Sequence, residues 1–336
     1  MSTASGVRHR AVVRLGALVS LALLVTACAG DSDGTGASSS PDEPGSPAAE
    51  ASVSPAAPVG PVGLDPDFAA DAADLAALAQ AAAQSIPQAG SIAPRDSPVL
   101  GGDISWPQCP TGMGIEHKQT LGLPMPTAEA EFVIIGLTNG PGFHANPCLS
   151  DQAAYARKRG LLTAAYAVAS YPSDAELDAY GQQGPYDGTT PAGALKNVGY
   201  QQAKFNVASM RAARLASPLV WIDVEPVPYY EWSTSTGANA AVVVGAARAY
   251  ADAGLSVGVY STPYLWDGVV GDLELGVPEW RAAGQSSRAE AERRCAPDWS
   301  IQGGEAVLGQ WVEDRRDKNV TCPGAERELG RWFAAN

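Results

Sequence analysis

The stretch PLVWIDVEP, residues 218–226, is the segment from which the fold of this chain can be worked out. Its apolar, β-branched residues predict a buried strand. Residues two apart on a strand point to the same face, so Asp223 and Glu225 project together from the end of an apolar element. Neighbouring carboxyls raise each other's pKa and are costly to bury, so we expect a functional site here. A structural network in which Arg or backbone groups satisfy both acids is the alternative.

Short apolar runs alternate with helical patterns on both sides of this segment. The expected strands cover residues 102–105, 132–139, 162–170, 219–225, 256–261, 279–283 and 306–312. The expected helices cover residues 147–159, 192–215, 237–253, 263–270 and 286–295. This alternation over about 230 residues predicts an α/β fold, a (β/α) TIM-barrel-like domain that allows for irregular last strands; an open doubly wound sheet is the alternative. No GxGxxG motif follows the first strand, and we expect no cofactor.

The first 27 residues predict an export signal, with a basic start and an apolar run, Leu15–Val25, that is shorter than the roughly 20 residues of a membrane span. The stretch VTAC, residues 25–28, resembles the lipobox of bacterial lipoprotein precursors. This resemblance implies cleavage before Cys28 and its acylation by palmitate-like chains. The protein would then be anchored in the cell membrane, on its extracytoplasmic face. A plain secretory signal with an incidental cysteine is the alternative.

Composition divides the remainder of the chain into three parts. Residues 28–63 are rich in Ser, Pro, Gly and Ala and predict a disordered tether. Residues 64–99 contain an Ala-rich helix, expected over residues 65–86, and a linker. Residues 100–336 form the expected barrel domain. The formal net charge of −14 disfavours nucleic acid as a partner.

The cysteine count predicts two disulfides. The chain has five cysteines, and setting Cys28 aside leaves Cys109, Cys148, Cys295 and Cys322. An even remainder in an exported protein favours disulfides, and three pairings are possible. We favour Cys109–Cys148 and Cys295–Cys322, which pair neighbours along the chain. Zinc is the alternative, but neither a CxxC nor an HxxxH spacing occurs, and we expect no metal site.

Polar and aromatic side chains stand at the ends of several expected strands. In a barrel, the carboxyl ends of the strands meet at one face, so we expect these side chains to converge. Two tyrosines that follow the acidic strand predict a binding rim, with core packing as the alternative. Carboxylates beside aromatic faces suit a sugar, because rings stack on the aromatic groups and acids act on the glycosidic oxygen. The candidates are Asp103, Asn139, Asp223, Glu225, Tyr229, Tyr230, Tyr260, Gln310 and Trp311.

In order along the chain, these pieces resemble the family 25 glycoside hydrolases, the lysozymes of the bacterial and phage cell-wall type. The matching pieces are GDIS (residues 102–105), FVII (132–135), DVE (223–225), GVYS (258–261), WRAA (280–283) and GQW (309–311). The resemblance implies that Glu225 is the general acid. Asp223 would hold up the pKa of Glu225, or orient a water or the acetamido group of the substrate. Asp103 would be the third acid.

The chain also departs from the pattern of this family. The family has a further Asp near its last strand, in a Val-Asp-x-Asn context. The corresponding stretch here, residues 317–322, reads DKNVTC with Cys322 in place of the acid, so we expect that carboxylate to be missing. The expected second strand ends in LTNG, residues 137–140, and there are insertions at residues 106–110 and 146–149. These features resemble an actinobacterial branch of exported, lysozyme-like domains.

Three hypotheses about function follow. The first is an exported, lipid-anchored monomer that hydrolyses glycosidic bonds of peptidoglycan by carboxylate acid/base chemistry. The second, motivated by the missing acid, is a cell-wall carbohydrate-binding lipoprotein without turnover. The third is a structural envelope protein whose partner is another protein.

Overall fold

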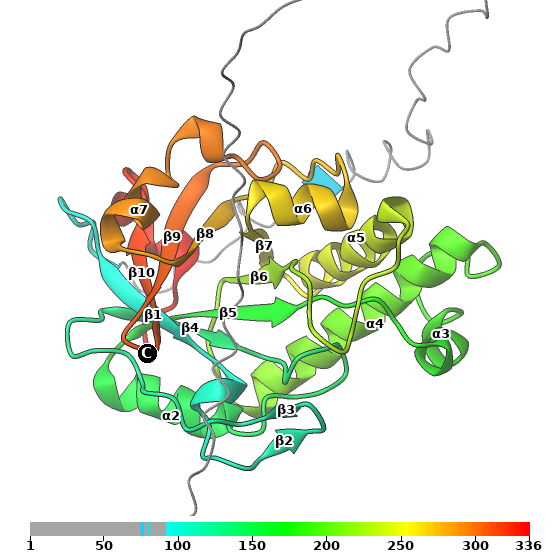
Figure 1. Cartoon of the computed structure of the whole chain (residues 1–336), viewed down its shortest axis with the longest axis horizontal. Helices are drawn as coiled ribbons and strands as arrows, with labels where there is room; N and C mark the ends of the chain where they lie inside the picture. Colours follow the sequence, from blue (N-terminus) through cyan, green and yellow to red (C-terminus); the bar gives the residue numbers. More distant parts are fainter. Residues whose placement is uncertain (1–74, 77–79, 81–91) are drawn as a thin grey trace, which may run out of the picture. The chain divides into compact units, whose positions relative to one another are not determined.

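The computed structural model describes residues 75–76, 80 and 92–336. Eight strands close into a barrel in the order β1-β10-β9-β8-β7-β6-β5-β4 (Figure 1). They are β1 (Leu100–Ile104), β4 (Phe132–Gly136), β5 (Leu162–Val168), β6 (Leu219–Asp223), β7 (Ser256–Ser261), β8 (Glu279–Gln285), β9 (Ala306–Glu313) and β10 (Arg316–Thr321). The predicted barrel is confirmed, and the open doubly wound sheet is wrong.

The irregularity that the sequence allowed for in the last strands is found in β10. This strand runs antiparallel to both of its neighbours, β1 and β9, whereas the other neighbouring strands of the barrel are parallel. The sequence did not predict β10, because its first four residues, 316–319, are all polar and give no apolar run. A short β-turn at Asp314 and Arg315, both with positive φ, joins β9 to β10. The barrel is therefore closed by a polar strand.

Five helices lie where the sequence predicts them. They are α2 (Leu149–Arg159), α4 (Pro191–Ala212), α5 (Thr236–Asp252), α6 (Pro263–Val270) and α7 (Arg288–Arg293). Two more, α3 (Asp174–Tyr180) and α8 (Leu329–Trp332), were not predicted; α3 buries none of its residues and so lacks an apolar face. Short 3-10 turns form η1 (Trp106–Gln108), η2 (Pro297–Trp299) and η3 (Ala325–Glu328). Among the described residues, no helix is both long and apolar enough to cross a membrane.

Most of the predicted N-terminal elements lie outside the described residues. This holds for the export signal, Cys28 and the tether. Of the helix expected at 65–86, the structure describes Leu75, Ala76 and Gln80, and all three are helical.

Strand β6 shows how the barrel positions its acids. Leu219 and Trp221 are buried in the same apolar cluster as Phe132 and Trp280, whereas the alternate residues Val220 and Ile222 pack in a second cluster with residues of α4 and α5. Asp223 continues the first set, because side chains two apart on a strand share a face. Trp221 and Trp280 fill the space beneath Asp223, and their rings meet edge to face with centroids 6.2 Å apart.

Both predicted disulfides form. Cys109 bonds to Cys148 at a Cα–Cα distance of 5.6 Å, and this links the chain after η1 to the start of α2. Cys295 bonds to Cys322 at 5.5 Å and links the chain after α7 to the end of β10. A small hairpin of β2 (Gly114–Ile115) and β3 (Lys118–Gln119) follows the first of these half-cystines. The first disulfide thus fastens the segment that follows the carboxyl end of β1, and the second lies near the amino end of β9, where Cys322 N donates to Val307 O.

Candidate active site

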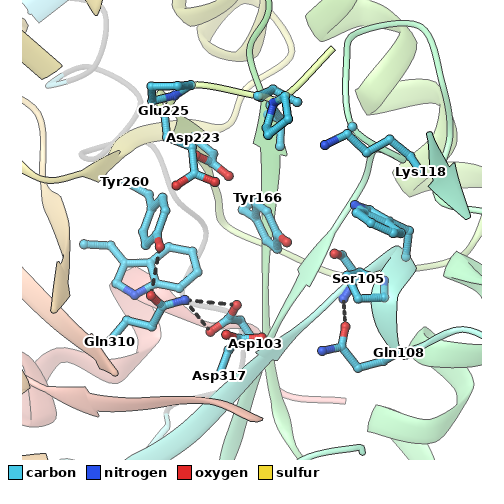
Figure 2. Close-up of a pocket in the computed structure, with 18 residues that line it drawn as sticks. Asp103, Ser105, Gln108, Lys118, Tyr166, Asp223, Glu225, Tyr260, Gln310 and Asp317 are labelled. Carbon is cyan, nitrogen blue, oxygen red and sulfur yellow. Dashed lines mark hydrogen bonds between the residues drawn. The ribbon is translucent and has the colours of Figure 1, made fainter. Parts of the chain in front are cut away.

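Three carboxylates predicted from strand ends lie together in one pocket. Asp103 comes from β1, Asp223 from the end of β6, and Glu225 from two residues beyond β6. The pocket has a volume of about 230 Å³ and opens at the carboxyl ends of the parallel strands, where enzymes with this architecture place their sites. Figure 2 shows Asp223 and Glu225 on one side of the pocket and Asp103 at its floor.

A fourth carboxylate, Asp317, lines the same pocket, so the expected absence of an acid near the last strand is wrong. Asp317 lies on β10 directly opposite Asp103 of β1 in the antiparallel register. The error came from placing the acid at Cys322, which is bonded to Cys295. Asp317 and Asn319 have an Asp-x-Asn spacing, and this spacing was the signal available in the sequence.

Burial raises the pKa of all four carboxyls. Burial first, and then the charge of Asp317, raise the pKa of Glu225 to about 7, and Lys118 opposes the rise. Burial raises the pKa of Asp317 to about 6 against a hydrogen bond from Gln108. The pKa of Asp103 lies well above its usual range, through burial first and then the charge of Asp317. Protonated and ionised carboxyls can therefore coexist in the pocket near neutral pH.

Asp103 is held by a chain of hydrogen bonds. Asn319 Nδ2 donates to Asp103 Oδ2 over 2.7 Å, and Gln310 Nε2 donates to the same oxygen over 3.1 Å. Trp280 Nε1 donates to Asn319 Oδ1 over 2.7 Å, and Tyr260 OH donates to Gln310 Oε1 over 2.8 Å. Each amide is thus fixed by an aromatic donor, and both amides present their N–H groups to Asp103.

Asp223 contrasts with Asp103. Its side chain is buried, yet its Oδ1 has no hydrogen-bond partner among the described residues. The pKa of Asp223 lies well above its usual range, through burial first, then the charge of Glu225, then that of Asp103. Asp223 and Glu225 were expected to raise each other's pKa. This is seen for the pKa of Asp223, whereas the neighbouring charge that raises the pKa of Glu225 is that of Asp317. A buried, unpartnered oxygen at a pocket is available to a water or a ligand.

Aromatic side chains form much of the pocket wall. Tyr260 packs on Trp280 with ring centroids 4.4 Å apart, and Tyr166 meets Trp280 edge to face at 5.8 Å. Trp106 of η1 lines the opposite part of the pocket with Lys118 of the hairpin. Sequence reasoning predicted Tyr260 and Gln310 but did not name Tyr166, Trp280, Trp106 or Lys118 as site residues. The first two could have been found from the alternation of side chains along β5 and β8.

Two predicted binding residues lie away from the pocket lining. Trp311 is buried between Ala291 of α7 and Val320 of β10, on the face of β9 opposite to Gln310, because neighbouring residues of a strand face opposite ways. Asn139 is buried beyond the end of β4, where its amide hydrogen-bonds to the backbone of the hairpin. The predicted strand over residues 132–139 in fact ends at Gly136.

Tyr229 and Tyr230, which were predicted to form a binding rim, contact the β2–β3 hairpin instead of lining the pocket. The Tyr229 ring is 64% exposed and stacks on His117, with centroids 4.2 Å apart. Tyr230 OH donates to the backbone oxygen of Glu116 over 3.2 Å. Both contacts join the loop after β6 to the tip of the hairpin, so the two segments close one side of the pocket mouth.

The arrangement suits acid/base chemistry on a polar ligand. A carboxyl with a pKa of about 7 can donate a proton near neutral pH, and an ionised neighbour can orient a nucleophilic water. Among the described residues, no three or more His, Cys, Asp or Glu side chains are grouped so as to hold a metal ion.

One family model matches part of the chain. Residues 186–294, about a third of the chain, match the family model described as lysozyme-like protein 1. This range includes β6, β7 and β8, hence Asp223, Glu225 and Tyr260, but neither Asp103 nor Asp317. No curated protein matches the sequence.

Solved structures with a similar fold include GH25 lysozymes. A bacterial lysozyme from Streptomyces coelicolor is 16% identical, with a TM-score of 0.45, over 70% of this chain and 97% of its own. A GH25 lysozyme from Aspergillus fumigatus is 19% identical, with a TM-score of 0.44, over 71% of this chain and 100% of its own. A glycosyl hydrolase 25 of Streptococcus pneumoniae is 13% identical, with a TM-score of 0.44, over 78% and 98%.

Proposed function

We propose that this protein is a glycoside hydrolase that cleaves glycosidic bonds of peptidoglycan, with Glu225 as the general acid. The observation that carries the proposal is the pKa of Glu225, about 7, in a pocket with three further carboxyls and aromatic walls. Glycosidases use one protonated carboxyl to protonate the leaving oxygen and a second carboxyl on the other side of the reaction centre. The match of residues 186–294 to a lysozyme-like family model supports a cell-wall glycan as substrate.

The remaining carboxyls have separate roles in this proposal. Asp223 has an unpartnered oxygen, so it orients a water or the acetamido group of an N-acetylated sugar. Asp103 is fixed by Asn319 and Gln310 and forms the floor against which the sugar is placed. Asp317 keeps the proton on Glu225 through its charge. The presence of Asp317 removes the reason for preferring a binding protein without turnover.

The test is a comparison of the wild-type protein with Glu225→Gln on purified cell wall. General acid catalysis contributes about 10²–10⁴-fold, so the variant should release reducing ends at least about 100-fold more slowly while remaining folded. Circular dichroism and sedimentation with insoluble peptidoglycan report fold and binding independently of turnover. Equal rates for the two proteins, or no release by the wild type, would reject the proposal.

We further propose that the protein is exported, acylated at Cys28 and held at the extracytoplasmic face of the cell membrane as a monomer. The lipobox-like residues 25–28 and the polar stretch that follows them support this proposal. It also fits the exported, actinobacterial-type branch that the insertions resemble. A Cys28→Ala variant should move from the membrane fraction to the soluble fraction, and its retention in the membrane fraction would reject the anchor.

A further inference from the structure

The β2–β3 hairpin is built to hold one lysine at the pocket. Asn139 Nδ2 donates to the backbone oxygen of Lys118 over 3.0 Å, and Asn139 Oδ1 accepts from the Ile115 N–H over 2.9 Å. One buried amide thus ties both strands of the hairpin to the end of the barrel. The stacking of His117 on Tyr229 fixes the hairpin tip from the other side. The backbone of Lys118 is therefore held at two places.

The stem of Lys118 passes close over the backbone of Gly140. A Cβ built on Gly140 would lie 3.1 Å from Lys118 Cγ and 3.5 Å from both Cδ and Cε. Gly140 also has a φ of +92°, which side chains other than glycine rarely adopt. The absence of a side chain at Gly140 lets the lysine lie along the pocket wall, and Figure 2 shows it reaching inward from the hairpin side.

The Lys118 ammonium forms no ion pair among the described residues, and the one neighbouring charge that acts on its pKa is that of Glu225. Lys118 is the only cationic side chain among the described residues that line the pocket, and four carboxyls line it as well. Within the described part of the chain, its ammonium is close to the Trp106 ring, at 5.9 Å from the centroid, but makes no ion pair. When Glu225 carries its proton, the partly desolvated ammonium lacks a counter-ion, so an anion supplied from outside would be stabilised there.

We propose that Lys118 is a specificity residue that binds a carboxylate carried by the glycan substrate. This inference rests on the proposed function and assigns the pocket mouth a preference for acidic N-acetylhexosamine chains. The charges that line the pocket favour one position for the carboxylate of such a ligand. A carboxylate is repelled by whichever of the pocket acids are ionised, and among the described lining residues it is attracted only by the ammonium at the hairpin.

Two sources could supply this carboxylate. The lactyl group of N-acetylmuramic acid carries a free carboxylate where no peptide is attached. Where a stem peptide is attached, the lactyl carboxyl is an amide, and the anionic group is a carboxylate of the peptide. The shared chemistry is an acid next to an N-acetylated sugar ring, and the ligands used in the test separate the two sources.

The experiment measures glycan binding by isothermal titration calorimetry in a Glu225→Gln background, so that no ligand is cleaved. The full chain is titrated with three oligosaccharides of equal length. One is a neutral N-acetylglucosamine oligomer, one alternates N-acetylglucosamine with peptide-free N-acetylmuramic acid, and one carries the stem peptide. The measured quantity is the ratio of the Kd for the neutral oligomer to the Kd for each acidic one.

The expected result is that Lys118→Met lowers this ratio about tenfold, as for loss of one hydrogen-bonded charge pair, and that Lys118→Arg restores most of it. A loss seen only with the peptide-free glycan assigns the lactyl carboxylate, and one seen only with the peptide-bearing glycan assigns the peptide. The matched control is Lys158→Met, an exposed lysine of α2, which should keep the unmodified ratio.

A ratio that Lys118→Met leaves unchanged for both acidic ligands overturns the inference. Cell-wall hydrolysis by the otherwise wild-type chain is assayed in parallel. Hydrolysis with an unchanged ratio rejects the role of Lys118 and leaves the proposed function standing. A changed ratio without hydrolysis supports the role of Lys118 and rejects the enzyme. Absence of binding to all three oligosaccharides rejects both.

Discussion

The barrel buries carboxylates in two regions, and the two regions differ in the hydrogen-bond partners that they give to these carboxylates. Glu279, at the start of β8, is fully buried and its oxygens accept hydrogen bonds from Arg281 Nε over 2.7 Å and from the backbone N–H groups of Ile301, Gln302 and Gly304 over 2.8–2.9 Å. Asp223, at the end of β6, is also buried, but its Oδ1 has no hydrogen-bond partner within the part of the chain that the structure describes. Burial alone does not separate the two residues.

The difference lies in what surrounds each acid. Arg281 forms an ion pair with Glu279 at 2.7 Å and also donates to the backbone oxygens of Arg294 and Ala296, so it joins β8 to the end of α7. No cation pairs with Asp223 among the described residues, and its nearest charged neighbours are other acids. A satisfied buried carboxylate stabilises a loop, whereas an unsatisfied one costs stability and is kept for function.

The largest effect on stability is expected when the ion pair of Glu279, the carboxylate whose hydrogen bonds are satisfied, is broken. Arg281→Met leaves Glu279 buried without its cation, and removing one partner of a buried ion pair costs about 3–5 kcal/mol of unfolding free energy. Urea unfolding followed by circular dichroism measures this loss. The matched control, Arg288→Met, removes an exposed pair with Glu292 on α7 and should cost no more than about 0.5 kcal/mol. Equal losses in the two variants would contradict the comparison.

A smaller effect is expected in the pH dependence of stability. The folded pKa of Glu225, about 7, is above its unfolded value of roughly 4.3, so the folded state holds the proton more tightly. The resulting stabilisation is present below the unfolded pKa and is lost as the pH rises through the folded pKa. At about 1.4 kcal/mol per pKa unit, unfolding free energy should fall by roughly 3 kcal/mol between pH 4 and pH 8 on account of this group.

Glu225→Gln should reduce that fall, because glutamine does not titrate. Urea unfolding at several pH values gives the two slopes. Glu274→Gln removes an exposed carboxyl outside the pocket and serves as the control, which should keep the wild-type slope. Parallel curves for wild type and Glu225→Gln would show that the pocket acid is not held protonated by the fold.

Much of the barrel was predictable because its strands are apolar and alternate with helices. The strands that were predicted have long buried runs, such as Phe132–Gly136 and Leu219–Asp223. The strand that was missed, β10, is polar over its first residues because those side chains face the pocket mouth or solvent. The polar side chains that this strand presents to the pocket remove the apolar pattern expected of a strand. Hydropathy alone therefore cannot detect it.

The site was predictable where a residue stands in or just after the last part of an expected strand. Asp103, Asp223, Glu225, Tyr260 and Gln310 could be named in this way, and they converge. Trp311 was misplaced because adjacent residues of a strand point to opposite faces, and the sequence did not say which of Gln310 and Trp311 faces inward. Lys118 was missed because its position depends on a hairpin that tertiary contacts hold in place.

The smallest predicted effect concerns Asp317, the pocket acid that the sequence was expected to lack. Its charge is the neighbouring charge that raises the pKa of Glu225, so Asp317→Asn should lower that pKa from about 7, by no more than about one unit. A lowered pKa would distinguish this role from a structural one, because a structural acid such as Glu279 would leave the pKa of Glu225 unchanged when it is replaced.

The pKa of Glu225 can be followed by ¹³C NMR of its carboxyl carbon, without any assay of activity. Asp272→Asn is the control, because Asp272 is exposed and lies outside the pocket. If Asp317 acts mainly through its charge on Glu225, its variant should also unfold no more easily than the wild type at pH 8, since it removes a partly buried like charge. A loss of stability without a shift in the Glu225 titration would place Asp317 with Glu279 among the structural acids.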